Sequence, residues 1–149
     1  MISAQDIKSL REETGFSFAQ CKKALKDSGG DKEKALASLK SQGEVIAEKK
    51  SDRAQNAGAV SAYVHATGSL GALVILLSET DFVAKNPDFK ALAYDIAMHV
   101  AAQAPEDITA LLAQPFIKDP EKTVADLIRD AVQKFGENIS ISRFERLTV

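Results

Sequence analysis

The spacing of apolar residues changes near residue 50, and this change constrains the fold more than any other feature of the chain. Residues 1–46 contain no alternation of apolar and polar residues, and their apolar side chains recur at helical spacing. Residues 59–65 and 72–78 instead have the composition of strands and are joined by a short turn. We therefore predict an α+β fold, with three helices followed by a small antiparallel sheet packed against further helices.

The same change divides the chain into two small domains, for which 149 residues are sufficient. We predict a three-helix domain over residues 1–46, a linker over residues 47–57 and an α+β domain over residues 58–149. Residues 47–57 are polar and have no apolar face, so they are interpreted as a linker or as the frayed extension of the third helix.

Two phenylalanines lie close together in the N-terminal domain. Thr14-Gly15 ends the first helix, and Phe16 and Phe18 follow directly before the second. Three helices of about ten residues bury only a small core. One phenylalanine is therefore expected to fill that core, and the other to remain partly exposed.

Three features predict the organisation of the second domain. Residues 72–78 are apolar on both faces, which suits a central strand covered on both sides. Asn86-Pro87 favours a helix start, with the asparagine as N-cap and the proline in the first turn. A short helix over 106–113, a long helix from about Pro120 to Phe135 and a final strand over 138–144 complete the domain.

Composition and charge exclude several classes of partner. The formal net charge of −2 provides no basic field for nucleic acid or for an anionic membrane surface. The longest apolar run, Leu70–Leu77, is far shorter than the roughly 20 residues of a membrane span, and no signal peptide follows Met1. A single cysteine fits a reducing compartment. We expect a cytoplasmic protein that contacts neither nucleic acid nor membrane.

Motifs for catalysis and for cofactors are missing. Neither glycine-rich phosphate loop occurs, so no direct nucleotide binding is expected. Cys21, His65 and His99 are too few and too scattered for a zinc site; Cys21 is interpreted as a buried thiol and His99 as a packed or surface side chain. Glu79 and Asp81 are a close carboxylate pair without the defined gap that acid–base catalysis needs. We therefore expect no enzyme, no cofactor and no metal.

The segment Thr80-Asp-Phe-Val83 follows the apolar strand directly and precedes the helix start at Asn86. Two interpretations compete for it. In the first, Thr80 or Asp81 caps a short turn and Phe82 belongs to the core. In the second, Phe82 projects from a rigid corner as an anchor for a partner protein, since aromatic side chains that fill a partner's pocket are common binding hot spots.

The sequence resembles the translation elongation factor Ts family over nearly its whole length. Four motifs carry the resemblance, and they occur in the family's order. They are Leu10-Arg-Glu-Glu-Thr-Gly15, Cys21-Lys-Lys-Ala-Leu25 with the Gly30-Asp31 entry to a helix ending in Gly43, Glu79-Thr-Asp-Phe-Val-Ala-Lys85, and Gly136-Glu-Asn-Ile139.

The resemblance implies a guanine-nucleotide exchange factor for elongation factor Tu, in its GDP-bound or nucleotide-free form. It also implies that the N-terminal domain is similar to ubiquitin-associated domains, and that the protein is located in the bacterial cytoplasm or in an organelle matrix. In the family, a phenylalanine wedges between helices of the G domain of elongation factor Tu and disturbs its magnesium site, which loosens GDP. The positions that match the family's partner-binding residues are Thr80, Asp81, Phe82 and Val83 for the wedge, Leu10, Phe18 and Ala19 for the N-terminal grip, and Gly136, Glu137 and Asn138 near the exchange surface.

The chain departs from the family in two respects. Many members carry two methionines where this chain has Phe18-Ala19, so the N-terminal grip is expected to be weaker or differently shaped. The chain also lacks the second core half and the coiled-coil insertion of longer members. This leaves open whether a second contact with elongation factor Tu exists and whether the protein forms a homodimer.

Two other functions remain open from the sequence. One is a protein-binding module similar to ubiquitin-associated domains, which would have no use for residues 80–83. The other is a relative that binds elongation factor Tu without promoting exchange.

Overall fold

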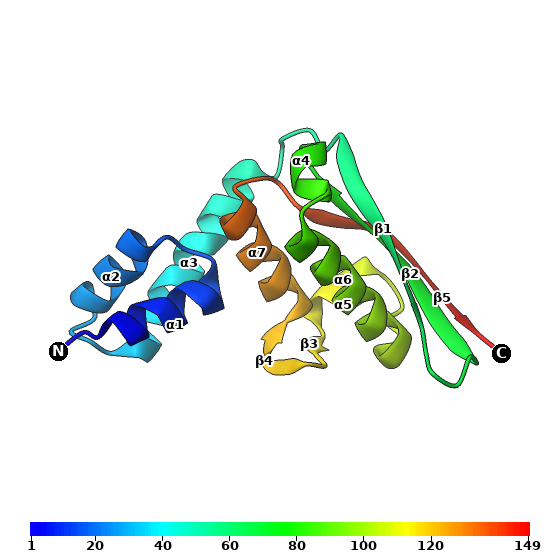
Figure 1. The fold of residues 1–149 in the computed structure, drawn as a ribbon, viewed down its shortest axis with the longest axis horizontal. Coiled ribbons are helices and arrows are strands. Elements are labelled where there is room, and N and C mark those ends of the chain that lie inside the picture. The colour runs from blue at the N-terminus through cyan, green and yellow to red at the C-terminus, as the bar shows by residue number, and fades with distance from the viewer. The chain divides into compact units, whose positions relative to one another are not determined.

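A computed structural model describes residues 1–149. They form two compact units, Met1–Asp52 with Arg129–Gly136, and Arg53–Ile128 with Glu137–Val149 (Figure 1). We call them the helical unit and the sheet unit. Helices together with an antiparallel sheet confirm the predicted α+β class. The helical unit includes residues that the sequence analysis placed in the second domain, and the boundaries of independently folding domains remain a prediction.

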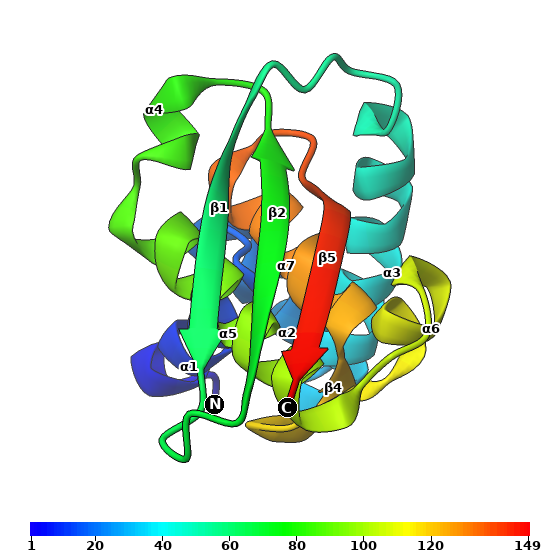
Figure 2. The same cartoon turned by 90° about the vertical axis from the view of Figure 1, so that its right-hand side faces the viewer.

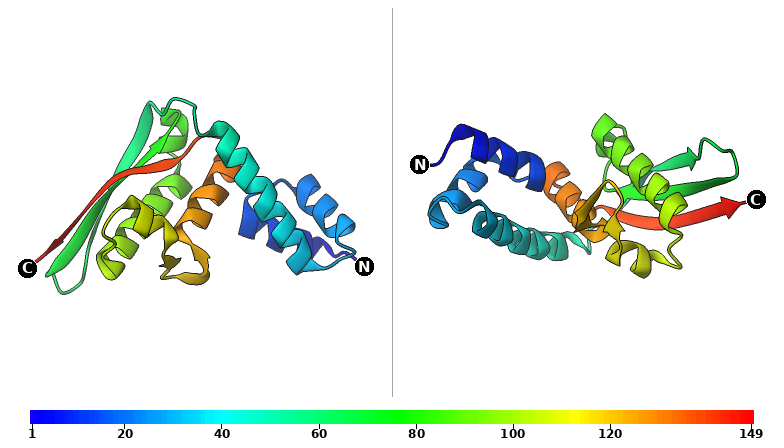
Figure 3. Two further views of the ribbon diagram at one scale, coloured as in Figure 1. Left: turned by 180° about the vertical axis from the view of Figure 1, so that it is seen from behind. Right: turned by 90° about the horizontal axis from the view of Figure 1, so that it is seen from below.

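The helical unit begins with α1 (Ala4–Thr14), α2 (Phe18–Asp27) and α3 (Lys32–Lys50), which Figure 3 shows from two sides. Ser3 and Ser17 cap the first two helices in capping boxes, which supply partners to backbone N–H groups that the helix itself leaves free. The third helix continues to Lys50, so residues 47–50 form its last turn, which is the second of the two interpretations given for this segment. The side chains that form the core are Ile7, Leu10, Phe16, Cys21, Ala24, Leu25, Ala35 and Leu39.

The turn between α1 and α2 brings the two phenylalanines to different environments. Phe16 is buried, whereas the Phe18 side chain is 48% exposed, which confirms that the small core takes only one of them. Gly15 makes this turn with a φ of 74°, a left-handed conformation that favours glycine. A Cβ at Gly15 would lie 2.9 Å from the backbone oxygen of Asp130, so the close approach of the segment 129–136 also requires glycine.

The sheet unit is built on three antiparallel strands in the order β1 (Ala57–Val64), β2 (Leu70–Ser78), β5 (Ser140–Thr148). The apolar strand β2 is central, as predicted. Helix α5 (Pro87–Gln103) packs against one face of the sheet, and the opposite face, toward the viewer in Figure 2, carries no helix of this unit. The prediction that β2 is covered on both sides is therefore wrong: Val74 is buried, but Leu73 is 44% exposed.

Short elements complete the sheet unit. They are α4 (Asp81–Ala84), α6 (Ile108–Ala113), β3 (Pro115–Phe116), β4 (Asp119–Thr123) and the start of α7 (Val124–Phe135). Asn86 caps α5 and Pro87 occupies its first turn, as predicted. No helix of the protein has both the length and the apolar composition needed to cross a membrane.

The last helix begins at Val124, not at Pro120 as predicted. Thr123 and Asp126 exchange hydrogen bonds between side chain and backbone at 2.9 and 3.1 Å, which is a capping box and marks Thr123 as the N-cap. Residues 119–123 instead pair with β3 as an antiparallel strand. The capping signal lies three residues beyond the proline, so the helical spacing alone placed the start too early. The final strand likewise begins later than predicted, at Ser140.

His99 is a buried polar residue that connects α5 to the β3–β4 hairpin. Its Nε2 hydrogen bonds to Oε1 of Gln114 at 2.9 Å, and its Nδ1 accepts the backbone N–H of Ile117 at 3.3 Å. The ring also stacks on Phe116, with the ring centroids 5.8 Å apart. Burial lowers the pKa of His99 below its ordinary value of 6.5, and a proton on Nδ1 would face the Ile117 N–H group. The folded protein therefore favours the neutral imidazole.

This geometry predicts how the stability of the protein depends on pH. Below about pH 6.5 the unfolded chain protonates His99 before the folded chain does, so the free energy of unfolding falls as the pH decreases. Thermal melts between neutral and mildly acidic pH are expected to show this decline, with a shallower slope in His99→Gln. That variant also loses about 1–3 kcal/mol at neutral pH because it disturbs buried hydrogen bonds. His65→Gln, at an exposed position, is the control and retains the full slope; equal slopes in all three proteins would contradict the assignment.

Candidate functional site at the corner between β2 and α4

The corner that follows β2 presents one large apolar side chain to solvent. In α4 (Asp81–Ala84), Val83 and Ala84 are buried, whereas Phe82 is 87% exposed. Thr80 is the N-cap, and its hydroxyl accepts the backbone N–H of Val83 at 3.4 Å. The capping role expected for Thr80 is confirmed, while the interpretation that places Phe82 in the core is wrong.

The exposure of Phe82 has an energetic meaning. Burial of a phenylalanine side chain contributes about 1.5–3 kcal/mol relative to full exposure, and the fold forgoes this gain at Phe82. The same short helix buries Val83 at 6% exposure, so apolar residues of this segment do have access to the core. An aromatic side chain held outward on a packed support is the arrangement typical of an interface anchor.

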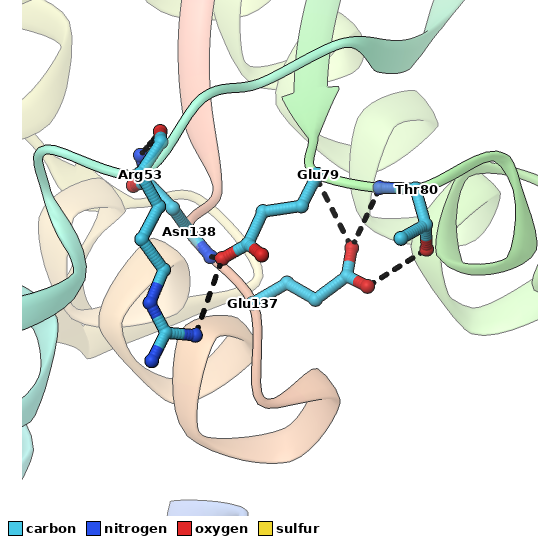
Figure 4. A network of polar contacts seen from close by, with 5 residues as sticks. All are labelled: Arg53, Glu79, Thr80, Glu137 and Asn138. Carbon is cyan, nitrogen blue, oxygen red and sulfur yellow. Dashed lines mark hydrogen bonds and ion pairs between the residues drawn. The ribbon is translucent and has the colours of Figure 1, made fainter.

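A single carboxylate, distant in sequence but adjacent in space, holds the corner. Glu137 accepts the backbone N–H groups of Glu79 and Thr80 through Oε1, both at 3.1 Å, and the Thr80 hydroxyl through Oε2 at 2.7 Å (Figure 4). Hydrogen bonds to an ionised acceptor are stronger than those between neutral groups. Three donors from two adjacent residues therefore converge on one side chain.

A second carboxylate, that of Glu79, accepts a hydrogen bond from the segment that carries Glu137. Glu79 accepts the backbone N–H of Asn138 at 2.7 Å and pairs with the guanidinium of Arg53 at 3.5 Å. The side chain of Asn138 donates to the backbone oxygen of Arg53 at 2.8 Å. We call Arg53, Glu79, Thr80, Glu137 and Asn138 the corner network; Figure 4 shows these side chains converging between the end of β2 and the start of β5.

The structure brings together several residues that the sequence analysis treated separately. Thr80 contacts Glu137, and Asn138 lies beside them with its side chain buried. Gly136, with a φ of 71°, ends α7 in a left-handed conformation directly before Glu137. Asp81 lies exposed in the first turn of α4.

Two members of the corner network were not recognised as site residues. Glu79 was interpreted as half of a carboxylate pair with Asp81, but its carboxylate is occupied by Asn138 and Arg53. Arg53 lies in the predicted linker and has no motif around it. The sequence separation between Arg53 and Asn138 is 85 residues, so no local pattern could have identified the pair.

The residues expected for the N-terminal grip occupy different environments. Phe18 and Ala19 are exposed in the first turn of α2. Leu10 is completely buried in the core of the helical unit, so its side chain is not on the surface. It supports the bundle that presents Phe18.

The residues considered for catalysis are placed as structural ones. Cys21 is completely buried, as predicted, and burial raises the pKa of its thiol, which keeps it protonated and weakly nucleophilic. No group of three histidine, cysteine or acidic side chains is arranged to hold a metal ion.

Comparison with known proteins gives one consistent result. A sequence model described as Elongation factor TS matches residues 79–149. The chain is 38% identical to Elongation factor Ts of Acetivibrio thermocellus, over 98% of this chain and 89% of that protein. It is 38% identical to Elongation factor Ts of Coprothermobacter proteolyticus, over 99% and 98%, and 39% identical to that of Heliobacterium modesticaldum, over 98% and 89%.

The alignments also show that this chain is shorter than its relatives. The one with the Coprothermobacter proteolyticus protein runs over 193 positions, so that relative has residues without a counterpart among the 149 of this chain. The segment that the family model matches includes both Phe82 and Glu137.

Proposed function

The chain belongs to the elongation factor Ts family, and on that premise we propose that it is a guanine-nucleotide exchange factor for elongation factor Tu. It binds elongation factor Tu with or without GDP and promotes GDP release during translation elongation, in the cytoplasm. It performs no covalent chemistry itself. Phe82 acts as the wedge, with Asp81 beside it as the polar partner, and Thr80 and Val83 shape the corner that carries them.

The observation that carries the proposal is the outward orientation of Phe82 on a helix whose next two residues, Val83 and Ala84, are buried. A protein that displaces a nucleotide without touching it needs only to bind the partner conformation that holds the nucleotide weakly. A projecting aromatic side chain can supply such differential binding, because desolvated aromatic anchors dominate many interfaces.

Thermodynamic linkage sets the size of the effect. If the exchange factor lowers the affinity of elongation factor Tu for GDP by a given ratio, GDP lowers the affinity of elongation factor Tu for the exchange factor by the same ratio. A thousandfold loss of GDP affinity corresponds to about 4 kcal/mol of differential binding. One well-packed aromatic anchor supported by a second contact is sufficient for this magnitude.

Release of a fluorescent GDP analogue from elongation factor Tu tests the function. The protein is expected to accelerate release catalytically. The Phe82→Ala variant is expected to have an exchange rate at least about tenfold lower, which corresponds to about 1.4 kcal/mol. Because Phe82 is exposed, its removal should leave the melting temperature nearly unchanged. Val45→Ala, another exposed apolar position, is the control and should retain full activity.

The alternatives predict different results in the same assay. Binding without acceleration would identify a partner of elongation factor Tu that does not promote exchange. Neither binding nor acceleration would leave a protein-binding module with a different target. Acceleration that is unaffected by Phe82→Ala would keep the exchange function and contradict the wedge.

We further propose that Phe18 and Ala19 provide a second contact with elongation factor Tu. Both are exposed at the start of α2, where Phe18 presents a half-exposed ring. Two contacts on one chain raise the effective concentration of the second once the first has formed. The N-terminal grip would then affect the affinity for elongation factor Tu more than the displacement of the nucleotide.

Titration of the exchange assay separates these two roles. Phe18→Ala is expected to raise the concentration for half-maximal acceleration by about tenfold, or about 1.4 kcal/mol, while the maximal rate stays unchanged, because it removes an aromatic anchor. Phe18→Met keeps an apolar contact of the kind common in the family and should behave like the parent. A fall in the maximal rate with unchanged half-maximal concentration would contradict this division.

The uncovered face of the sheet is proposed to bind a second copy of the chain. Val60, Leu73 and Leu147 are exposed on it, at 67%, 44% and 68%. The register places Arg143 and Glu145 on the same face, where they pair at 3.0 Å. A copy related by a two-fold axis would present the same apolar surface and an acidic group to each arginine. Exposed apolar surface of this kind favours association.

Measurement of the molecular mass in solution tests the second copy. The parent is expected to show a dimer that dissociates on dilution, and Leu73→Lys is expected to shift the equilibrium to monomer, because it buries an unpaired charge in the interface. Val45→Lys introduces the same charge in the helical unit and should leave the dimer intact. A monomeric mass for the parent over the whole accessible concentration range would refute the proposal.

A further inference from the structure

The helix that carries Phe82 is too short to be stable without support from the rest of the sheet unit. α4 contains four residues, and helices shorter than about twelve residues are marginal in water without tertiary support. Val83 and Ala84 anchor its second half in the core. The direction in which Phe82 leaves the surface therefore depends on what holds the backbone immediately before it, at Glu79 and Thr80.

Glu137 is the side chain that holds this backbone. It accepts the N–H groups of both residues, and the hydroxyl of Thr80, at 2.7–3.1 Å. The two N–H groups lie between the end of β2 and the start of α4, where neither element supplies them with an acceptor. The carboxylate of Glu137 is thus directed inward, toward the corner.

Phe82 has little else to orient it. At 87% exposure its ring lacks the surrounding contacts that fix a core side chain. A binding anchor held in place before association avoids the cost of ordering it in the complex. Displacement by about one ångström is enough to impair a functional site that requires a defined geometry.

We propose that Glu137 is a positioning residue for nucleotide exchange, acting through the hydrogen bonds that fix Glu79 and Thr80 and thereby Phe82. The inference rests on the proposed exchange function. It gives Glu137 a different part from the partner contact that the family resemblance implies, because the carboxylate acts within the chain and not on elongation factor Tu.

Two conservative variants distinguish a positioning role of Glu137 from a direct contact with elongation factor Tu in the GDP release assay. Glu137→Gln keeps the side-chain length and a carbonyl oxygen for both N–H groups, and its amide can donate to the Thr80 oxygen. Glu137→Asp keeps the charge but is too short to reach all three donors. We expect exchange within about twofold of the parent for Glu137→Gln and about tenfold slower for Glu137→Asp. Glu106→Asp, at an exposed position without a part in the corner network, is the control.

The opposite order would overturn the proposal, because retention in Glu137→Asp and loss in Glu137→Gln is the behaviour of a charge that contacts the partner. Equal losses in both variants, or no loss in either, would also overturn it. Thermal melts confirm that each variant is folded at the assay temperature. Should Glu137→Asp fail to fold, Thr80→Val replaces it, because the valine removes the hydroxyl that donates to Glu137 and caps Val83; Thr80→Ser keeps this hydroxyl and is the control.

A double-mutant cycle adds a second test. If Glu137 acts only through Phe82, then adding Glu137→Asp to the Phe82→Ala variant should lower the rate of GDP release by less than about twofold further. An additional loss of about tenfold in that background would show that Glu137 acts independently of Phe82 and would overturn the proposal.

Amide hydrogen exchange of the free protein distinguishes failure of this inference from failure of the proposed function. In Glu137→Asp the amides of residues 79–84 are expected to exchange faster than in the parent, with the rest of the sheet unit unchanged. This result would support the hold of Glu137 on the corner even if the parent protein did not accelerate GDP release. Unchanged amide protection at residues 79–84 would overturn the proposed role of Glu137, whatever the result of the GDP release assay.

Discussion

Two reciprocal carboxylate contacts hold the corner on which the candidate site depends. Glu137 accepts the backbone N–H groups of Glu79 and Thr80, and Glu79 accepts that of Asn138, across separations of 57, 58 and 59 residues. Each segment therefore supplies a carboxylate acceptor for backbone N–H groups of the other. The contacts join the end of the central strand to the entry of β5 and place a four-residue helix that could not form alone. The exposed Phe82 is positioned by this arrangement together with the burial of Val83 and Ala84.

The protein leaves apolar surface exposed in both units, although it has little core from which to derive stability. Phe18, Phe82 and the outer face of the sheet all remain in contact with solvent. Small domains are marginally stable, so each unburied aromatic ring forgoes stabilisation that the fold could have used. Such exposure is characteristic of surfaces that associate with other proteins. It fits a member of a family whose activity consists of binding.

Local patterns were sufficient for much of the fold. The N-cap at Asn86, the central position of β2, the buried thiol of Cys21 and the contrast between Phe16 and Phe18 were all predicted, because each depends on residues near in sequence or on the size of the core. The start of the last helix was placed too early, since helical spacing continues through residues that pair with β3 instead. The uncovered face of β2 was also missed, because apolar composition alone does not say which neighbour is present.

The α+β class, the family motifs and the order of the helices and strands apart from the β3–β4 hairpin follow from the residues themselves, because periodicity, capping and turn preferences act over a few positions. Whether Phe82 joins the core or projects from it did not follow, since both outcomes satisfy the same local pattern. That choice depends on the burial of Val83 and Ala84 beside it and on a carboxylate 57 residues away from Thr80. Contacts between such distant segments exist only once the chain has folded, and the orientation of the site is a property of that folded state.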